Sequence, residues 1–365
     1  MALFKEKNIT KKTEPHNSNS KRKEEHLFIA LNQDVSFKKI NSGFEDYNFI
    51  HQALPETDLN DIDTSTEVFG KKLKLPLMIS PLVGGIKAAE EINRNLAKVA
   101  GICRIAMGVG SQRAGIENTG NEKTYQVREI APDILLFANL GAVQLNYGFG
   151  INECSRAINM IDADGIILHL NSLQEAFQSG GNHNFKNLAA KIEEICKSSH
   201  YPVVVREVGF GISADTAVKL VKAGVSGIDA GGAGGTSWIE VEKFRSDSKV
   251  LKNIADSFSE WGIPTAESIK MIKEAVSKCN GTNNNKIVIF ASGGIRSGID
   301  VAKAIALGAD IAAIGLPVLK NIQISVRRCI DYIQEIETGL KIAMFGIEAR
   351  NINELKNTRY LKRKA

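Results

Sequence analysis

Short apolar stretches alternate along this chain with segments of helical periodicity. Segments such as 88–101 and 215–225 repeat apolar residues every three or four positions, which predicts amphipathic helices. Residues 239–278 are too many for one crossover helix, so we expect an extra loop or helix there. Eight stretches are predicted to be strands: Leu77–Ser80, Ile105–Gly110, Leu135–Leu140, Gly165–Leu170, Val203–Val208, Gly227–Ala230, Ile287–Ser292 and Ile311–Gly315.

This alternation predicts an α/β protein with a TIM, or (β/α)₈, barrel. An open doubly wound sheet is the alternative, because alternation alone does not show closure. We expect a polar, disordered arm over 1–25 and an N-terminal extension over 26–74 that contributes to the site. The barrel is predicted over 75–345, followed by a basic tail over 346–365 whose last ten residues are expected to be solvated.

Composition and charge exclude several classes of protein. Of the 365 residues, 43% are hydrophobic and 24% charged, as in ordinary globular proteins. Aromatic residues are only 6%, few for a surface that stacks nucleic-acid bases. The net charge of +5 comes from the two ends of the chain, and the remainder is slightly acidic. We therefore expect no nucleic-acid partner.

Cysteine usage and hydropathy indicate a cytoplasmic location. The five cysteines contain no C-x-x-C pair, which argues against disulfides and against a zinc site. The first residues have no apolar core of the kind that signal peptides carry. The longest apolar stretch, 304–319, is interrupted by Asp310, so we expect no membrane span.

Polar residues and glycines gather at the end of every predicted strand. Because the carboxyl ends of barrel strands converge on one face, these residues are expected to form one shared site. They are Ser80, the GSQR sequence at 110–113, Asn139, the HLNSLQE sequence at 169–175, Arg206, the GGAGGTSW sequence at 231–238, the SGGIR sequence at 292–296 and Gly315.

Two of these segments have the composition of phosphate-binding loops. Residues 292–296 place two glycines and an arginine before a helix, where backbone N–H groups can hold a phosphate. Gly315 and Leu316 precede another helix and can add donors. Residues 231–238 are interpreted as a mobile loop around an anion, with hydroxyls from Thr236 and Ser237. A purely structural glycine-rich turn is the alternative for both segments.

The fourth strand end and the basic arm suggest a diphosphate substrate. Residues 169–175 combine an imidazole, two amides and a carboxylate, and Glu175 is a candidate Mg²⁺ ligand beside a diphosphate. The KRKEEH sequence at 21–26 is interpreted as an arm that folds over a phosphate, and Arg113 as an anion clamp. A hydrogen-bonded loop and a solvated basic segment remain the alternatives.

Taken together, these residues resemble the type 2, FMN-dependent isopentenyl-diphosphate isomerases. The resemblance extends from about Arg22 to Asn353. Its motifs are specific through their order and spacing: RKEEH (22–26), ALPETDLNDIDTSTEVFGKKL (53–73), IAMGVGSQR (105–113), ANLGA (138–142), HLNSLQE (169–175), EVGFGIS (207–213), GAGGTSW (232–238), WGIPTAES (261–268), ASGGIR (291–296) and IAMFGIEARN (342–351).

The resemblance implies a homo-oligomer, often a tetramer or octamer, that uses reduced FMN, Mg²⁺ and NADPH as flavin reductant. The flavin would do most of the acid–base work, with Gln174 and His169 at the reacting centre and Glu175 on the metal. The implied substrate contacts are Arg22, Lys23, His26, Arg113, His169, Asn171 and Gln174. The implied FMN contacts are Ser80, Met107, Ser111, Asn139, Arg206, Thr236, Gly293, Gly294, Arg296, Gly315 and Leu316.

Two positions depart from the family pattern. Val83 stands where the family has a threonine before two glycines, so a hydroxyl to the flavin is missing. Arg206 replaces a lysine at the N1/O2 edge of the flavin, and its planar guanidinium hydrogen-bonds differently.

The rival functions lack key residues. An α-hydroxy-acid oxidase or dehydrogenase needs a basic histidine late in the barrel, and none occurs after the fifth strand. A purine-nucleotide dehydrogenase needs a loop cysteine, whereas Cys279 is in a predicted helix. A flavin-binding barrel without catalytic activity remains open.

Overall fold

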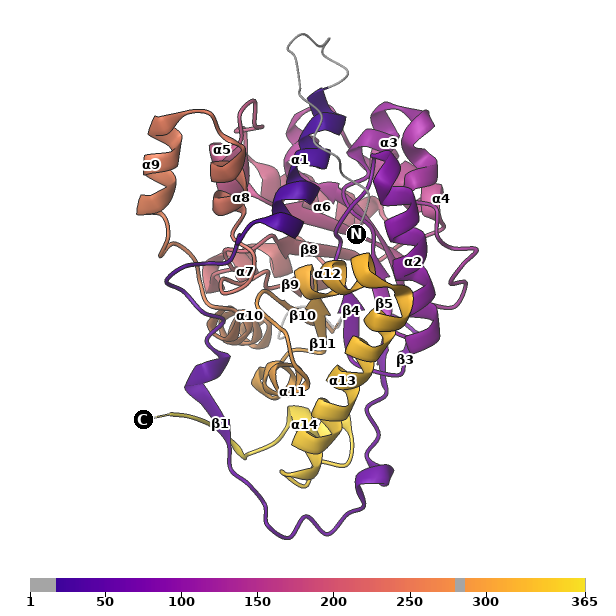
Figure 1. The fold of residues 1–365 in the computed structure, drawn as a ribbon, viewed down its shortest axis with the longest axis vertical. Coiled ribbons are helices and arrows are strands. Elements are labelled where there is room, and N and C mark those ends of the chain that lie inside the picture. The colour runs from indigo at the N-terminus through magenta and orange to yellow at the C-terminus, as the bar shows by residue number, and fades with distance from the viewer. Residues whose placement is uncertain (1–17, 280–285, 365) are drawn as a thin grey trace.

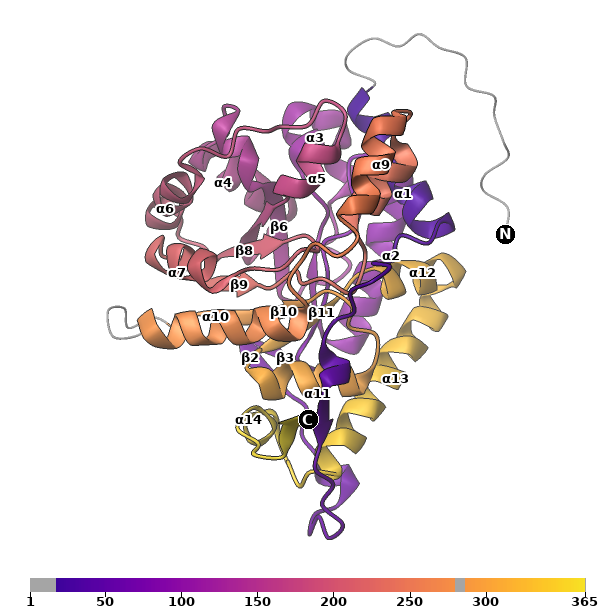
Figure 2. The same ribbon diagram turned by 90° about the vertical axis from the view of Figure 1, so that its left-hand side faces the viewer.

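The computed structural model describes residues 18–279 and 286–364. At its centre, eight parallel strands close into a barrel that helices surround (Figures 1 and 2). In order they are β4 (Leu77–Ile79), β5 (Ala106–Gly108), β6 (Leu136–Gly141), β7 (Gly165–Leu170), β8 (Val203–Glu207), β9 (Gly227–Asp229), β10 (Val288–Ser292) and β11 (Ile311–Ile314), which pairs with β4. Each predicted stretch contains one strand. Closure excludes the open doubly wound sheet.

The outer helices follow the predicted periodicity. The main helices around the barrel are α2 (Lys87–Cys103), α4 (Ile151–Ile161), α6 (Leu188–Ser198), α7 (Ala214–Lys222), α10 (Thr265–Cys279), α11 (Gly298–Leu307) and α13 (Val326–Phe345). Shorter helices follow strand ends: α3 (Arg113–Glu117), α5 (Ser172–Phe177) and α12 (Leu316–Ile324). The expected insertion is confirmed, because α8 (Trp238–Arg245) and α9 (Lys249–Ser257) precede α10. Short 3₁₀ helices occupy Phe44–Asp46, Leu59–Asp61, Thr119–Thr124 and Ala142–Asn146.

Each barrel strand separates two apolar layers. Inward side chains such as Met78, Ile167 and Val204 pack in the barrel interior. Neighbouring residues such as Ile166 and Val205 point outward and pack beneath the helices. This division follows from the two-residue period of a strand.

A hairpin closes the amino-terminal end of the barrel. It consists of β2 (Thr66–Val68) and β3 (Lys71–Leu73), joined at Phe69, whose φ of 49° is positive. The Phe69 ring lies 6.1 Å from the ring of Phe137 and 6.4 Å from that of Phe290, measured between centroids. The opposite, carboxyl end is the one left for a site.

Both ends of the chain differ from the sequence prediction. Helix α1 (Ser18–Asn32) lies across the carboxyl end of the barrel, so the prediction of disorder is wrong for 18–25, while 1–17 lie outside the described residues. The C-terminal segment forms α14 (Ile352–Lys356) and β12 (Leu361–Arg363), which pairs with β1 (Tyr47–Phe49), so it has regular structure that was not predicted, while Lys362, Arg363 and Lys364 are exposed to solvent as predicted. Among the described residues, no helix has the length and apolar character needed to cross a bilayer.

Candidate active site

A ring of polar side chains lies above the apolar barrel interior, at the carboxyl ends of the strands. In six barrel strands, the inward-facing position that follows the interior layer, two residues further along the chain, carries a polar side chain. These residues are Ser80, Asn139, His169, Arg206, Asp229 and Ser292. Each lies at the carboxyl end of its strand. Asp229 was not predicted as a site residue, and Ser292 was predicted only as part of the 292–296 segment, although alternation along their strands marks both as inward-facing.

A cavity of about 570 Å³ opens above this ring. That volume is typical of sites for cofactors and small ligands. Predicted site residues from all parts of the chain line it: Arg22, Lys23, His26, Ser80, Ser111, Arg113, Asn139, His169, Asn171, Gln174, Glu175, Arg206, Thr236, Gly293, Gly294, Arg296, Gly315 and Leu316. The structure thus brings 18 of the 19 residues implied by the family resemblance to one place.

Met107 is the exception. On β5 it is Ala106 that faces the barrel interior, and Met107 is fully buried in the layer between barrel and helices. Its side chain therefore does not line the cavity, whereas the other implied FMN contacts do. The strand alternation explains this, since adjacent residues face opposite sides.

His169 is held in one orientation by Asn139. Its Nδ1 lies 2.8 Å from Asn139 Oδ1, while Asn139 Nδ2 donates to the Val109 carbonyl at 3.1 Å. Nδ1 therefore carries the proton, and Nε2 of the neutral ring is an acceptor. Burial lowers the pKa of His169 to about 4, with contributions from Arg206 and Lys23. The imidazole is accordingly neutral at pH 7.

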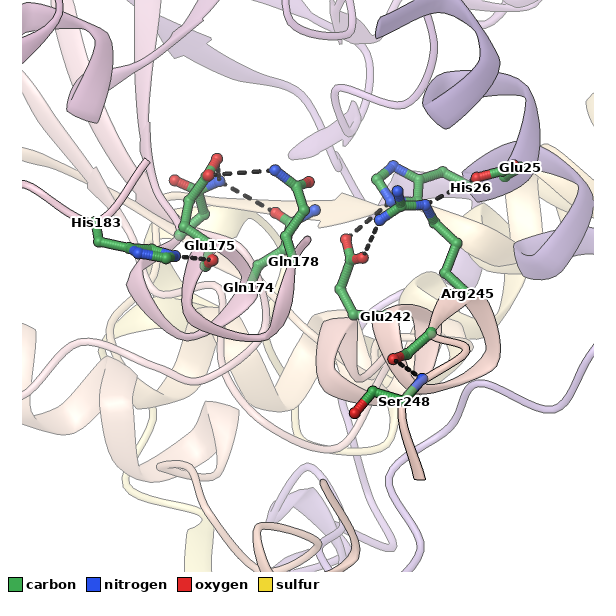
Figure 3. Close-up of polar contacts among 11 residues, drawn as sticks. Glu25, His26, Gln174, Glu175, Gln178, His183, Glu242, Arg245 and Ser248 are labelled. Carbon is green, nitrogen blue, oxygen red and sulfur yellow. Dashed lines mark hydrogen bonds and ion pairs between the residues drawn. The ribbon is translucent and has the colours of Figure 1, made fainter. Parts of the chain in front are cut away.

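Glu175 is held by a polar network that the sequence analysis only partly identified (Figure 3). Its carboxylate accepts hydrogen bonds from Asn171 Nδ2 at 3.0 Å, Gln178 Nε2 at 3.3 Å and the Asn182 N–H at 2.5 Å. His183 Nε2 lies 2.8 Å from the Glu175 carbonyl oxygen. Sequence reasoning missed Gln178 and His183, which follow the motif by only a few residues.

Lys23 reaches from α1 into the turn after β4. Its Nζ donates to the carbonyls of Gly84 at 2.9 Å and Ser111 at 3.0 Å, and to the Tyr125 hydroxyl at 3.1 Å. Burial lowers the pKa of Lys23 to about 7, and the nearby Arg22 contributes. The predicted anion clamp Arg113 lies close by and pairs with Glu117 at 2.6 Å.

A second network fastens α1 to α8 (Figure 3). His26 Nε2 lies 2.8 Å from Glu242 Oε1, and Arg245 bonds Glu242 at 2.6 Å and Glu25 at 2.9 Å. Burial alone would raise the pKa of Glu242, but the hydrogen bonds from His26 and Arg245 lower it. Sequence reasoning missed Glu242 and Arg245, whose i, i+3 spacing places them on one face of α8.

The two glycine-rich loops pack closely on each other. A Cβ on Gly293, at φ 107°, would lie 2.1 Å from the Gly232 carbonyl oxygen, which only glycine allows. Arg296 Nη2 donates to the Gly234 carbonyl at 3.2 Å. Ser237 does not serve the cavity as predicted, because its hydroxyl caps α8 by accepting from the Glu240 N–H at 3.4 Å.

Buried polar atoms in this cavity fit a polar ligand such as FMN. Ser80 Oγ, Asn171 Oδ1 and Arg206 Nη1 are buried without a hydrogen-bond partner in the described residues. Such atoms destabilise a protein unless a ligand satisfies them. Within 18–279 and 286–364, no cluster of three His, Cys, Asp or Glu residues offers a complete metal site.

Comparisons with known proteins agree with this geometry. Residues 19–129 and 168–362 match the family model "FMN-dependent dehydrogenase". An isopentenyl-diphosphate delta-isomerase of Synechocystis is 48% identical over 334 residues, covering 92% of this chain and 93% of the relative. The enzyme of that name from Oceanobacillus iheyensis is 43% identical over 339 residues, covering 93% and 95%.

Solved structures show the same barrel. A lactate oxidase of Pediococcus acidilactici aligns over 96% of this chain and 94% of its own, with a TM-score of 0.64 and 18% identity. A flavocytochrome b2 mutant aligns over 92% and 82%, with a TM-score of 0.66 and 16% identity. At such identities the likeness concerns the fold alone. The family match and the curated relatives together show that the chain belongs to the FMN-dependent dehydrogenase family and, within it, to the FMN-dependent isopentenyl-diphosphate delta-isomerases.

Proposed function

We propose that this protein interconverts isopentenyl and dimethylallyl diphosphate in isoprenoid biosynthesis, with reduced FMN and Mg²⁺. The observation that carries the proposal is the 48% identity to a curated isomerase across 92% of the chain. The cavity supports it, because cationic, amide and glycine-rich segments from distant parts of the chain meet there.

FMN fits the polar ring and the loops beside it. The backbone of Gly293, Gly294, Gly315 and Leu316, with Arg296, would hold the phosphate, and Ser111 and Thr236 would make further contacts. Ser80 Oγ and Arg206 Nη1 are the partnerless atoms available to the ring. Reduced FMN supplies an electron-rich surface that stabilises a cation-like transition state and exchanges protons.

The diphosphate would lie under α1. Arg22, Lys23 and His26 come from this helix, and Arg113 from the start of α3, so four basic side chains line the cavity. Charge-assisted hydrogen bonds from such groups are the strongest available to phosphate oxygens. Glu175 would bind Mg²⁺ together with the diphosphate, since a single carboxylate plus phosphates is a common magnesium site.

The hydrocarbon part would lie between the flavin and the β7 end. His169 presents Nε2 as an acceptor, because Nδ1 is bonded to Asn139. Gln174 is 8% exposed and lines the cavity, so it can orient the alkene and restrict water there. These two side chains position the reacting carbons.

Assays with isopentenyl diphosphate, Mg²⁺, FMN and NADPH test the proposal. Dimethylallyl diphosphate is expected only under reducing conditions, and Gln174→Asn is expected to lose most turnover. Gln323→Asn, at an exposed position of α12, is the matched control. Flavin binding without turnover would instead support the non-catalytic barrel, and oxidation of a 2-hydroxy acid would support the dehydrogenase.

The metal and the assembly need separate measurements. If Glu175 binds Mg²⁺, Glu175→Ala raises the Mg²⁺ concentration needed for half-maximal rate, and an unchanged requirement contradicts this role. We also propose a homo-oligomer, a tetramer or octamer, for which analytical ultracentrifugation is decisive. NADPH as reductant and a cytoplasmic location complete the proposal.

A further inference from the structure

Arg206 has a buried acidic neighbour on the next strand. In the barrel register, Arg206 of β8 pairs with Asp229 of β9 on one side and with His169 of β7 on the other. All three side chains point inward at the same level of the barrel. Arg206 lines the cavity, whereas Asp229 lies behind it and is fully buried.

The two oxygens of Asp229 have different surroundings. Oδ1 accepts hydrogen bonds from Ser292 Oγ at 2.6 Å and from the Gly231 N–H at 3.3 Å. Oδ2 lies 3.5 Å from Arg206 Nε and accepts no hydrogen bond among the described residues. On Arg206, Nη1 is buried and has no partner there. One end of the guanidinium therefore faces the carboxylate, and its other end is available to a ligand.

This pairing changes the charge that a cavity ligand experiences. An unpaired guanidinium at the barrel mouth would present a full positive charge to a bound ring system. With the Asp229 carboxylate beside the Arg206 guanidinium, the two opposite charges nearly cancel, so the positive field at a bound ligand is weak. Interactions between such buried charges are weakly screened by salt.

We propose that Asp229 is a positioning residue for the flavin: it holds Arg206 with Nη1 toward bound FMN and weakens the positive field at the ring. On reduction, two electrons and one proton enter FMN, and the ring gains one negative charge. A weaker positive field stabilises that charge less, so Asp229 keeps the midpoint potential of the flavin low. A low potential suits a flavin that must be electron-rich. The inference rests on the proposed function only for the identity of the ligand, FMN.

The test is the midpoint potential of FMN-bound protein without substrate. Dithionite with a reference dye reduces wild type and Asp229→Asn, whose amide oxygen still accepts from Ser292 but whose charge is gone. We expect the variant to favour reduced over oxidised FMN about tenfold more than wild type, a positive shift of about 30 mV for a two-electron couple. Asp215→Asn removes one negative charge at an exposed position of α7, outside the cavity lining, and should retain the wild-type potential. Equal potentials in wild type and Asp229→Asn overturn the proposal.

A second variant tests the proposal in case Asp229→Asn does not fold. Loss of one partner of a buried charge pair is strongly destabilising, whereas loss of both is tolerated. The double variant Arg206→Met/Asp229→Asn should therefore recover the melting temperature. If the double variant is as unstable as the single one, Asp229 is a folding residue and the proposal is wrong. The isomerase assay on wild type is independent of these measurements. Failure of the proposed function can therefore be distinguished from failure of the proposal about Asp229.

Discussion

Gly84, in the turn after β4, should tolerate no side chain. A Cβ at this position would lie 1.9 Å from Cε1 of Tyr125, and 2.7 and 2.8 Å from Cδ1 and Cζ. Tyr125 is fully buried, and its hydroxyl donates to the Ser111 carbonyl at 2.8 Å and accepts from Lys23 at 3.1 Å. The ring can make room only by leaving these partners.

The cost of Gly84→Ala follows from that geometry. Overpacking a well-filled site costs about 1–3 kcal/mol. Loss of the two hydrogen bonds of the Tyr125 hydroxyl adds about 1 kcal/mol each. We therefore expect the free energy of unfolding to fall by about 3–5 kcal/mol, and Lys23 to lose its position beside the cavity.

Urea unfolding of the flavin-free protein measures this loss. Gly101→Ala in α2 is the matched control, because its Cβ would meet nothing closer than Ala131 Cβ at 3.5 Å. In a helix that change is expected to stabilise by about 0.4–1 kcal/mol. In a Tyr125→Leu background, which removes the clashing ring atoms, Gly84→Ala should cost much less. A loss under about 1 kcal/mol, or one unaffected by Tyr125→Leu, refutes the reasoning.

Three further changes test other parts of the fold. Burial lowers the pKa of Lys23 to about 7, while the unfolded chain keeps the proton toward 10.5, so wild type should gain stability relative to Lys23→Met as pH rises from 7 to 9. An unchanged difference in urea unfolding at several pH values contradicts this. Burial raises the pKa of Glu207 to about 7, although hydrogen bonds from backbone N–H groups act to lower it. Between pH 4.5 and 7 the folded state therefore binds a proton that the unfolded chain has released. As the pH rises from 4.5 to 7, wild type should therefore lose stability relative to Glu207→Gln, measured again by urea unfolding. Phe69→Ala should cost about 2–4 kcal/mol, because it uncovers the barrel end, whereas Phe244→Ala, at an exposed ring, should cost little in the same urea assay.

The barrel was predictable because its strands are buried on both faces. Such strands appear in the sequence as short continuous apolar stretches, and all eight were located. The gathering of polar residues at one end was equally visible, since parallel strands present their carboxyl ends together. Asp229 was overlooked because it stands inside an apolar stretch. Its position two residues after the inward-facing Gly227 nevertheless predicts that its side chain points into the barrel.

Features that depend on specific pairing could not be predicted in this way. Residues 18–25 are polar and show no apolar stripe, so they resemble a disordered segment. Their helix is fastened by the contacts of Lys23, His26 and Glu25 with distant residues, which no periodicity reveals. Strand β12 likewise depends on its partner β1 and not on an apolar pattern of its own. Tertiary contacts decide the structure of such segments.

The geometry of His169 explains how a barrel shared with hydroxy-acid oxidases can serve a different reaction. A base that takes a proton from a hydroxy acid works best with a pKa near the working pH. Burial and the cations Arg206 and Lys23 lower the pKa of His169 to about 4, which makes it a weak base. Asn139 additionally binds Nδ1 and leaves Nε2 to accept a hydrogen bond. Such an imidazole orients a substrate better than it removes a proton, which supports the proposal that reduced FMN exchanges the protons.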